Sequence, residues 1–596
     1  MKLILDYDPK PQYIVISTDT PESNEWKNFF NLTTSSTPVL KCQTDRIVYY
    51  VPDFVKCSTD IISYGTSHGF FINSSDRFKE LTNRISVIPY TEALKAQTRT
   101  ETEINNILLC KGFKRKLKPN QLHNIMKISS LPGCASFSVP GAGKTTEALA
   151  YFCLNSEKQS KLLVVAPKNV LVAWDEQIKD CIPDQDYHFI RLTGGRDNIR
   201  KLLSDSPDFS IVTYQQLPLI VDYIKDYLLK FPNSFIFLDE SHKIKGNKVY
   251  AQAVNEISMY APYKMILSGT PMPQSVKDLV PQFRFLYPTE PSDEYSVVGQ
   301  FQPIFVRTTQ DQLGIPKIDR RLIKLNMSEI QNDVHKLLKS EMRRQLNGVL
   351  DDDSKSQLRR LGKCTMKMLQ FVSNPSLLAS DMNYIFNPKM GQLLMSCNGP
   401  KIEYACKRAR QLAAEGKKVI IWTSFVKNVE YLAKRLSDLG AEFIHGGVEA
   451  GSDSELTTRE GKLKNFHQNP KAMVLVANPA AASEGISLHT VCQHAIYLDR
   501  TFNAAQYLQS EDRIHRLGLR EDQVPVEEII QCTGTIDEVV QSRLYEKVKA
   551  MSKVLNDPSL DISALSFDYD ESDDEYAYLS KKDVKEVYNY FFKEGQ

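Results

Sequence analysis

A glycine-rich segment, Ser138-Val-Pro-Gly-Ala-Gly-Lys144-Thr145, has the composition and spacing of a loop that binds phosphate. Glycines such as Gly141 and Gly143 let backbone N–H groups converge on phosphate oxygens, and the N-terminus of a following helix adds a favourable dipole. The helix-forming run 146–152 comes directly afterwards. We expect Lys144 to reach the β- and γ-phosphates and Thr145 to give its hydroxyl to Mg²⁺. The segment predicts a nucleoside triphosphate site; the alternative is a glycine-rich loop with a chance Gly-Lys-Thr.

An acidic pair that could complete this chemistry, Asp239-Glu240, follows the apolar run 235–238. In open parallel sheets, ligands gather at the carboxyl ends of the strands. We therefore expect Asp239 to hold the Mg²⁺ shell, and Glu240 to orient and deprotonate the attacking water. His242 is expected to link this nucleotide site to the rest of the molecule. The alternative is two acids at a surface strand end.

Composition places the chain among ordinary globular proteins. Of its 596 residues, 42% are hydrophobic and 24% charged, and the formal net charge of +2 means that any nucleic-acid contact must come from local patches. No run approaches the roughly 18–20 apolar residues of a membrane span, and we expect no signal peptide in the first residues, where acids come early. The eleven cysteines include no C-x-x-C pair. We expect free thiols in a reducing, intracellular setting, cytoplasmic or, in a eukaryote, nuclear, with no membrane association.

Two regions alternate apolar, β-branched runs with amphipathic segments of helical length, which is typical of parallel α/β sheets. The expected strands of these regions are 162–166, 210–213, 235–238, 419–422, 473–477 and 495–498. Between the two regions the chain is charged, with helices expected at 334–350 and 355–371. We expect an accessory α/β domain at 1–110, with strands at 13–17, 46–51 and 69–72, an ATP-binding lobe at 111–324, a helical insertion at 325–415, a second lobe at 416–550, and a tail with a terminal helix at 551–596. Residues 557–575 contain eight acids and no lysine or arginine, so we expect that stretch to be solvated and mobile.

Further short blocks stand in a fixed order around the two regions. They are Leu117-Lys-Pro-Asn-Gln121, Val164-Val-Ala-Pro-Lys168, Val212-Thr-Tyr214, Ser268-Gly-Thr-Pro271, Phe305-Val-Arg-Thr308, Val419-Ile-Ile-Trp-Thr-Ser-Phe425, His445-Gly-Gly447, Ala482-Ser-Glu-Gly-Ile-Ser-Leu488 and Gln509-Ser-Glu-Asp-Arg513-Ile-His-Arg516-Leu-Gly518. With the phosphate loop and the acidic pair, they resemble the Swi/Snf-type branch of superfamily-two helicases, which translocate on double-stranded DNA. The resemblance covers residues 115–550. It implies two tandem RecA-like lobes, with ATP and Mg²⁺ as cofactors.

The resemblance also assigns roles to residues. It implies that Gln121 reads adenine, and that Arg513 and Arg516 complete the ATP site from the second lobe. Three residues apart, these arginines would share one face of a helix; the alternative is a solvated basic helix face. The other residues implied at the nucleotide are Gly141, Gly143, Thr146, His242, Gly485 and Gln509. The candidate contacts with DNA are Lys168, Thr193-Gly-Gly195, Thr213, Ser424 and Ser483. The alternative for a lone serine or threonine after a strand is a helix cap.

The sequence therefore predicts an ATP-driven motor that steps along the phosphate backbone of mainly duplex DNA. Two alternatives stay open: a strand-separating DNA or RNA helicase, and a DNA-binding or assembly module that ATP only switches. Several positions depart from the family pattern, among them Ala481, Ser487, Ala504 and Leu519. The departures affect the expected DNA contacts more than ATP turnover. We expect a monomer that meets any protein partner through residues 1–110 or the acidic tail.

Overall fold

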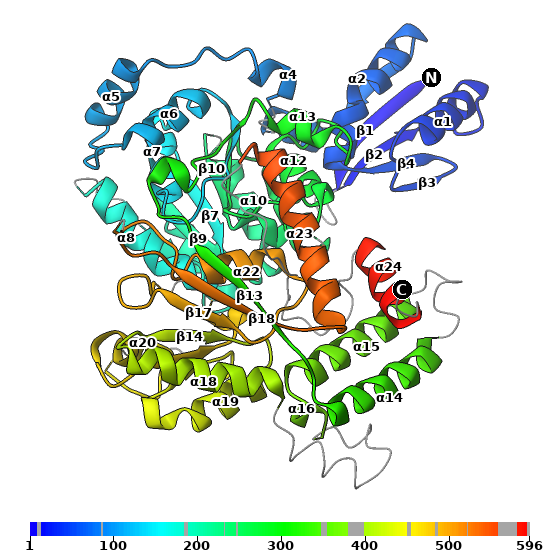
Figure 1. Ribbon diagram of the computed structural model, residues 1–596. Coiled ribbons are helices and arrows are strands. Elements are labelled where there is room, and N and C mark those ends of the chain that lie inside the picture. The colour runs from blue at the N-terminus through cyan, green and yellow to red at the C-terminus, as the bar shows by residue number, and fades with distance from the viewer. Residues whose placement is uncertain are drawn as a thin grey trace. The chain divides into compact units, whose positions relative to one another are not determined.

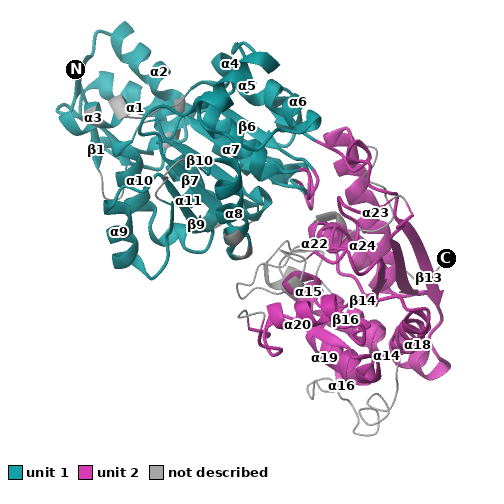
Figure 2. Ribbon diagram, turned by 90° about the vertical axis from the view of Figure 1, so that its left-hand side faces the viewer, with its two compact units in different colours: residues 1–138, 143–271, 276–307 teal, residues 139–142, 272–275, 308–596 magenta. Residues whose placement is uncertain are grey.

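The computed structural model describes residues 1–8, 13–84, 88–183, 189–231, 233–245, 248–346, 355–379, 399–449, 454–482, 487–520, 522–557 and 581–592. The chain forms two compact units (Figure 2). Unit 1 comprises residues 1–138, 143–271 and 276–307. Unit 2 comprises residues 139–142, 272–275 and 308–596.

Unit 1 begins with a small α/β domain. Its sheet has the strand order β3-β4-β2-β1-β5. The strands are β1 (Lys2–Asp8), β2 (Tyr13–Thr18), β3 (Lys41–Gln43), β4 (Arg46–Tyr50) and β5 (Phe71–Ser74), and the helices are α1 (Asn24–Ser36), α2 (Val51–Ser67) and α3 (Asp76–Arg84). Alternate residues such as Leu3, Leu5, Ile14 and Ile16 are buried, because one face of a pleated strand packs on a core while the other faces outward.

A seven-stranded parallel sheet forms the rest of unit 1, in the order β12-β6-β11-β10-β7-β9-β8 (Figure 1). Its strands are β6 (Gly133–Ser136), β7 (Leu162–Ala166), β8 (Phe189–Arg191), β9 (Phe209–Thr213), β10 (Phe235–Asp239), β11 (Tyr263–Leu267) and β12 (Phe305–Val306). The central strands β7 and β10 are buried along their whole length, which explains their continuous apolar sequences. The main helices are α6 (Pro119–Ile128), α7 (Lys144–Asn155), α8 (Leu171–Cys181), α9 (Arg196–Ser204), α10 (Val221–Lys230), α11 (Lys248–Ser258) and α12 (Leu279–Leu286).

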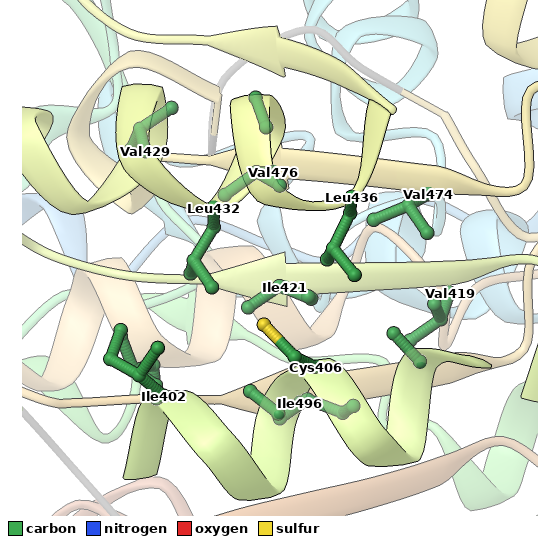
Figure 3. Packing of buried hydrophobic residues seen from close by; sticks show 14 of the residues in the cluster. Ile402, Cys406, Val419, Ile421, Val429, Leu432, Leu436, Val474, Val476 and Ile496 are labelled. Carbon is green, nitrogen blue, oxygen red and sulfur yellow. The ribbon is translucent and has the colours of Figure 1, made fainter. Parts of the chain in front are cut away.

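Unit 2 holds a second parallel sheet, of six strands in the order β13-β18-β17-β14-β16-β15. The strands are β13 (Asp319–Leu325), β14 (Val419–Trp422), β15 (Glu442–Ile444), β16 (Val474–Ala477), β17 (His494–Tyr497) and β18 (Val526–Cys532). The helices α18 (Pro400–Ala414) and α19 (Val426–Arg435) pack on the face that carries Val419 and Ile421 (Figure 3). Both units thus build a RecA-like parallel sheet, and the predicted fold class is confirmed.

Three charged helices pack together in unit 2: α14 (Glu329–Leu346), α15 (Lys355–Ser373) and α24 (Lys581–Phe592). Helices α15 and α24 also contact α23 (Ile536–Leu555), which follows the second sheet (Figure 1). The contact between α24 and α23 contains a buried carboxylate, Asp583, which accepts hydrogen bonds from Arg543 Nε at 2.6 Å and Lys547 Nζ at 3.1 Å. This ion cluster fixes the terminal helix against the second lobe.

The structure differs from the sequence-based expectations in several bounds. The strand expected at 69–72 is β5, which begins at Phe71 because Phe70 closes the end of α2 through a bond to Gly65 O. Residues 319–324, expected at the end of the first lobe, belong to β13 and pair with β18 of the second sheet. The expected mobile acidic stretch lies outside the described residues from 558 onward. Among the helices that the structure describes, none has the length and apolarity needed to span a lipid bilayer.

Candidate active site

The phosphate loop joins β6 to α7. Gly141 and Gly143 have φ angles of 84° and 90°, a left-handed region that a residue with a Cβ enters only at a cost. Gly143 is the N-cap of α7, so the loop delivers Lys144 and Thr145 to the first turn of a 12-residue helix. The N–H groups of that turn form an anion-binding site. Lys144 Nζ donates a hydrogen bond to Ser138 O at 2.8 Å, which holds the side chain over its own loop.

Gln121 lies directly beside this loop. It is buried on α6, where its Oε1 accepts the N–H of Lys118 at 3.0 Å. A Cβ added to Gly143 would stand 2.2 Å from Gln121 Nε2, so a side chain at this position would displace the Gln121 amide. The structure thus brings the residue expected to read adenine next to the residues expected to hold phosphate.

Thr146 is also close but is used differently from the expectation. Its side chain is buried, and its hydroxyl donates to Gln177 Oε1 of α8 at 3.1 Å. This contact fixes α7 against α8. Thr145, by contrast, is half-buried, so its hydroxyl can meet a ligand.

The acidic pair lies at the carboxyl end of β10, as expected. Asp239 is the last residue of the strand, and its Oδ2 accepts a hydrogen bond from Trp174 Nε1 of α8 at 2.8 Å. Its Oδ1 accepts the N–H of Glu240 at 2.9 Å. Glu240 has φ +49° and ψ 52°, a left-handed conformation that costs a non-glycine residue roughly 1–2 kcal/mol. Such strain is typical of functional sites, where the surrounding contacts enforce it.

His242 connects the acidic pair to the segment that follows β11. Its Nδ1 lies 3.3 Å from Glu240 Oε2 and 3.0 Å from Ser268 Oγ. Ser268 Oγ in turn accepts the N–H of Thr270 at 3.2 Å. His242 thus connects Glu240 to the loop 268–271 through short contacts, and the linking role expected for it stays a prediction.

Two residues that sequence reasoning did not assign support this half of the site. Trp174 orients Asp239, as described above. Glu147 is fully buried on α7, one turn after Lys144, and accepts hydrogen bonds from Asn124 Nδ2 and Ser136 Oγ, both at 2.8 Å. Burial raises the pKa of Glu147 to about 7. A carboxyl group within an otherwise apolar helix face was the only sequence signal for it.

The predicted arginines lie in unit 2, but not on a helix. Helix α22 (Ala504–Glu511) ends before them, and the chain continues in turns through Arg513 to Arg516. The expectation that both share one helical face is therefore wrong. Arg513 Nε donates to Gln509 O at 2.9 Å, and this bond satisfies a carbonyl at the end of α22, where the helix has no further N–H to offer. Arg513 and Gln509 are buried, whereas Arg516 is half-buried.

Comparisons with known proteins agree with these features. Residues 126–395 match the SNF2-related domain, and residues 400–518 match the helicase conserved C-terminal domain. The chain belongs to the SWI2/SNF2 type of superfamily-two, helicase-like ATPases.

Individual relatives are distant. A chromodomain-helicase-DNA-binding protein 1-like from Danio rerio is 23% identical over 74% of this chain and 44% of its own length. The transcription regulatory protein SNF2 of Saccharomyces cerevisiae is 21% identical over 72% of this chain and 27% of its own. This SWI2/SNF2-type chain thus matches less than half the length of these curated relatives. A solved Sulfolobus solfataricus SWI2/SNF2 ATPase core in complex with dsDNA is 20% identical, covering 80% of this chain and 97% of that one, with a TM-score of 0.32.

The residues expected at DNA lie at the ends of strands in both units of the SWI2/SNF2-type chain. Lys168 is exposed after β7, and Thr213 ends β9, where its Oγ1 accepts the N–H of Gln216 at 3.2 Å. Ser424 follows β14, and its N–H donates to Asp499 Oδ1 at 2.7 Å. Ser483 and Gly485 lie outside the described residues. The contact from Asp499, which sequence reasoning missed, fixes the backbone that presents Ser424.

The donor set of unit 1 suits ATP and Mg²⁺. Mg²⁺ binds through one or two protein oxygens together with phosphate oxygens and water, and Thr145 and Asp239 offer a hydroxyl and a carboxylate. The loop, with Gly141 and Gly143 in the left-handed region before a helix N-terminus, suits a phosphate chain.

Proposed function

We propose that this chain is an ATP-driven motor that translocates on DNA, mainly duplex DNA. The observation that supports this most directly is the joint presence, on one sheet, of a phosphate loop with Lys144 after β6 and of Asp239 and Glu240 at the end of β10. A module that only binds ATP needs no acid to activate water. The SWI2/SNF2 family membership supports DNA as the track.

The roles of the residues follow from their chemistry. ATP supplies the phosphoanhydride bond, and Mg²⁺ the positive charge beside its phosphates. Lys144 binds phosphate, while Glu240 orients the attacking water and accepts its proton. Arg513 and Arg516 neutralise charge that develops in the transition state, an effect worth roughly 10³–10⁵ in rate for arginine fingers. Because they belong to the other lobe, hydrolysis would be coupled to the relative movement of the lobes.

Contacts with the phosphate backbone suit a motor, because they carry no sequence information. Lys168, Thr213, Ser424 and Ser483 are the proposed contacts. DNA affinity should then fall steeply with salt, by roughly 10³–10⁵ between 50 and 200 mM for six to ten phosphate contacts. A DNA affinity that does not change with salt concentration would contradict binding through the phosphate backbone.

The decisive experiment is ATP hydrolysis by the purified chain with single-stranded, duplex and forked DNA. Duplex DNA should stimulate turnover most, and Glu240→Gln should lower kcat by about 10²–10⁴-fold while nucleotide affinity stays within about twofold. Glu176→Gln, an exposed acid of α8, is the matched control and should behave as wild type. Equal turnover in Glu240→Gln and wild type would refute the assignment.

Two alternative functions predict different results in the same preparation. A translocase displaces the third strand of a triplex without separating a duplex, whereas a strand-separating helicase unwinds a tailed duplex. A switched assembly module would bind DNA in an ATP-dependent manner without sustained turnover.

A further inference from the structure

The segment that connects the two parallel sheets contacts the arginine segment at three places. This connecting segment, residues 308–320, leads from β12 into β13, and the arginine segment comprises residues 511–516. Gln310 Nε2 donates to Asp512 Oδ1 at 3.4 Å. His515 Nε2 lies 2.6 Å from Pro316 O, to which it donates. The third contact is an ion pair between the Arg320 guanidinium and the Glu511 carboxylate, at 2.5 and 3.2 Å.

Along the arginine segment, the residues that make these contacts lie between and beside the two arginines proposed to act on ATP. The residues that face the connecting segment are Glu511, Asp512 and His515, and the residues proposed to act on ATP are Arg513 and Arg516. A shift of the connecting segment would therefore move the backbone that carries both guanidiniums. Gln310 and Pro316 lie in the covalent link between the two sheets. Any change in the separation of the lobes must therefore change the conformation or position of this link.

The ion pair at Arg320 is buried and hard to separate. The side chains of Arg320 and Glu511 are 9% and 3% exposed. A second carboxyl, Glu527 of β18, lies 3.7 Å from Arg320 Nε and accepts a hydrogen bond from Tyr507 OH at 2.6 Å. Although burial opposes it, the charge of Arg320 lowers the pKa of Glu511. Burial and then the charge of Glu511 raise the pKa of Glu527, which favours the protonated form of this second carboxyl.

We propose that Gln310, His515 and Arg320 are positioning residues that transmit the movement of the connecting segment to Arg513 and Arg516. The proposal rests on the proposed function, because it concerns how the same ATP site is completed. In this arrangement the connecting segment holds the arginine segment, so that a change in lobe separation changes the position of the guanidiniums directly. The buried Arg320–Glu511 pair makes the attachment of the arginine segment to the connecting segment rigid. The hydrogen bonds from Gln310 and His515 define the orientation of the arginine segment.

The main test compares kcat and KM for ATP, with duplex DNA present, in full-length variants. Arg320→Met combined with Glu511→Gln removes both charges of the pair, so that neither partner is left as an unpaired ion. Because misplacement by about 1 Å can cost about 10²-fold, we expect kcat to fall by about that factor. KM should stay within twofold, since Lys144 and Gln121 lie in unit 1. Arg321→Gln, the exposed neighbour on β13, is the matched control and should keep both parameters.

A second pair of variants guards against misfolding of the first. His515→Ala should lower kcat, and His515→Gln should restore at least half of it, because a glutamine amide can replace Nε2 as donor to Pro316 O. A general packing role would not be rescued in this way. Gln310→Ala should give a smaller loss of kcat in the same direction.

The outcomes separate the two proposals. If the wild type does not hydrolyse ATP, the proposed function fails. If the wild type hydrolyses ATP and Arg513→Ala abolishes this, but the Arg320–Glu511 double variant and His515→Ala keep wild-type kcat, the positioning role is refuted. A rise in the KM for ATP in these variants, with kcat unchanged, would also refute the positioning role.

Discussion

Glu147 places an ionisable group in the core of the phosphate-binding lobe, and its replacement by glutamine should stabilise that lobe at neutral pH. Glutamine keeps the geometry: its amide oxygen can accept from Asn124, and its amide nitrogen can donate to Ser136 Oγ. The hydroxyl of Ser136 can then donate to Ser138 Oγ, which lies 3.3 Å away. Only the charge is removed.

The magnitude follows from the pKa. In the folded chain, burial raises the pKa of Glu147 to about 7 from an ordinary 4.5. Between these pH values the folded state binds the proton and the unfolded state does not, so the stability of the wild type falls as the pH rises. The loss is complete above pH 7 and amounts to about 3 kcal/mol, since each pKa unit corresponds to roughly 1.4 kcal/mol. Glu147→Gln should thus equal the wild type near pH 4 and exceed it by about 3 kcal/mol at pH 8.

Hydrogen exchange of peptides covering α7 measures this lobe without interference from unit 2. At pH 8, backbone protection in Glu147→Gln should exceed that of the wild type by about 10²-fold, and at pH 5 by only about fourfold. Glu103→Gln is a control whose effect on stability should have the opposite sign, a loss at neutral pH. The N–H of Thr100 stabilises the charged form of Glu103 and holds its pKa below the usual range. Protection that is equal at both pH values would refute the buried-carboxyl reasoning.

Three further predictions concern stability. Burial lowers the pKa of Lys264 to about 7. Allowing for the lost hydrogen bond to Ser258 O, Lys264→Met should therefore stabilise unit 1 by about 3 kcal/mol at pH 7, measured by urea unfolding. This gain in stability should vanish as the pH approaches 10.5, the ordinary pKa of lysine. Asp583→Ala should cost about 3–5 kcal/mol of α24 docking, because it removes the carboxylate that faces two buried cations; unchanged proteolytic resistance of residues 581–592 would contradict this. Gly461→Ala should lower the Tm of unit 2 and cost about 1–3 kcal/mol, since the added Cβ would meet Glu455 O at 1.9 Å.

Local sequence patterns predicted the strands well because buried parallel strands are short, continuous and apolar. The run 162–166 is β7 without any shift, and 419–422 is β14. Residues 319–324 were misplaced for the opposite reason. Their sequence, Asp-Arg-Arg-Leu-Ile-Lys, is polar, and only its pairing with β18, some 200 residues later, makes it a strand of the second sheet.

The spacing of motifs located the side chains that we propose to act on ATP, but not the residues that hold them in place. Lys144 and Glu240 could be predicted because loop and strand-end chemistry repeats at fixed offsets. Trp174, Asp499 and Arg320 could not, because each acts through a contact that depends on the tertiary fold. The prediction that Arg513 and Arg516 share a helical face is wrong because α22 ends at Glu511. The Arg513 side chain donates a hydrogen bond back to Gln509 O at the end of that helix.

The contacts that support the two proposed sets of site residues lie in different units. Glu147 connects α6, which carries Gln121, to the strand and helix on either side of the phosphate loop, and all of these lie in unit 1. Arg320 and His515 hold the arginine segment within unit 2. Because the two sets share no residue and no element, variants of the first set should change nucleotide affinity and variants of the second should change kcat. Their effects on kcat/KM should add in free energy when combined, unless the two lobes couple during hydrolysis, in which case the deviation from additivity measures that coupling.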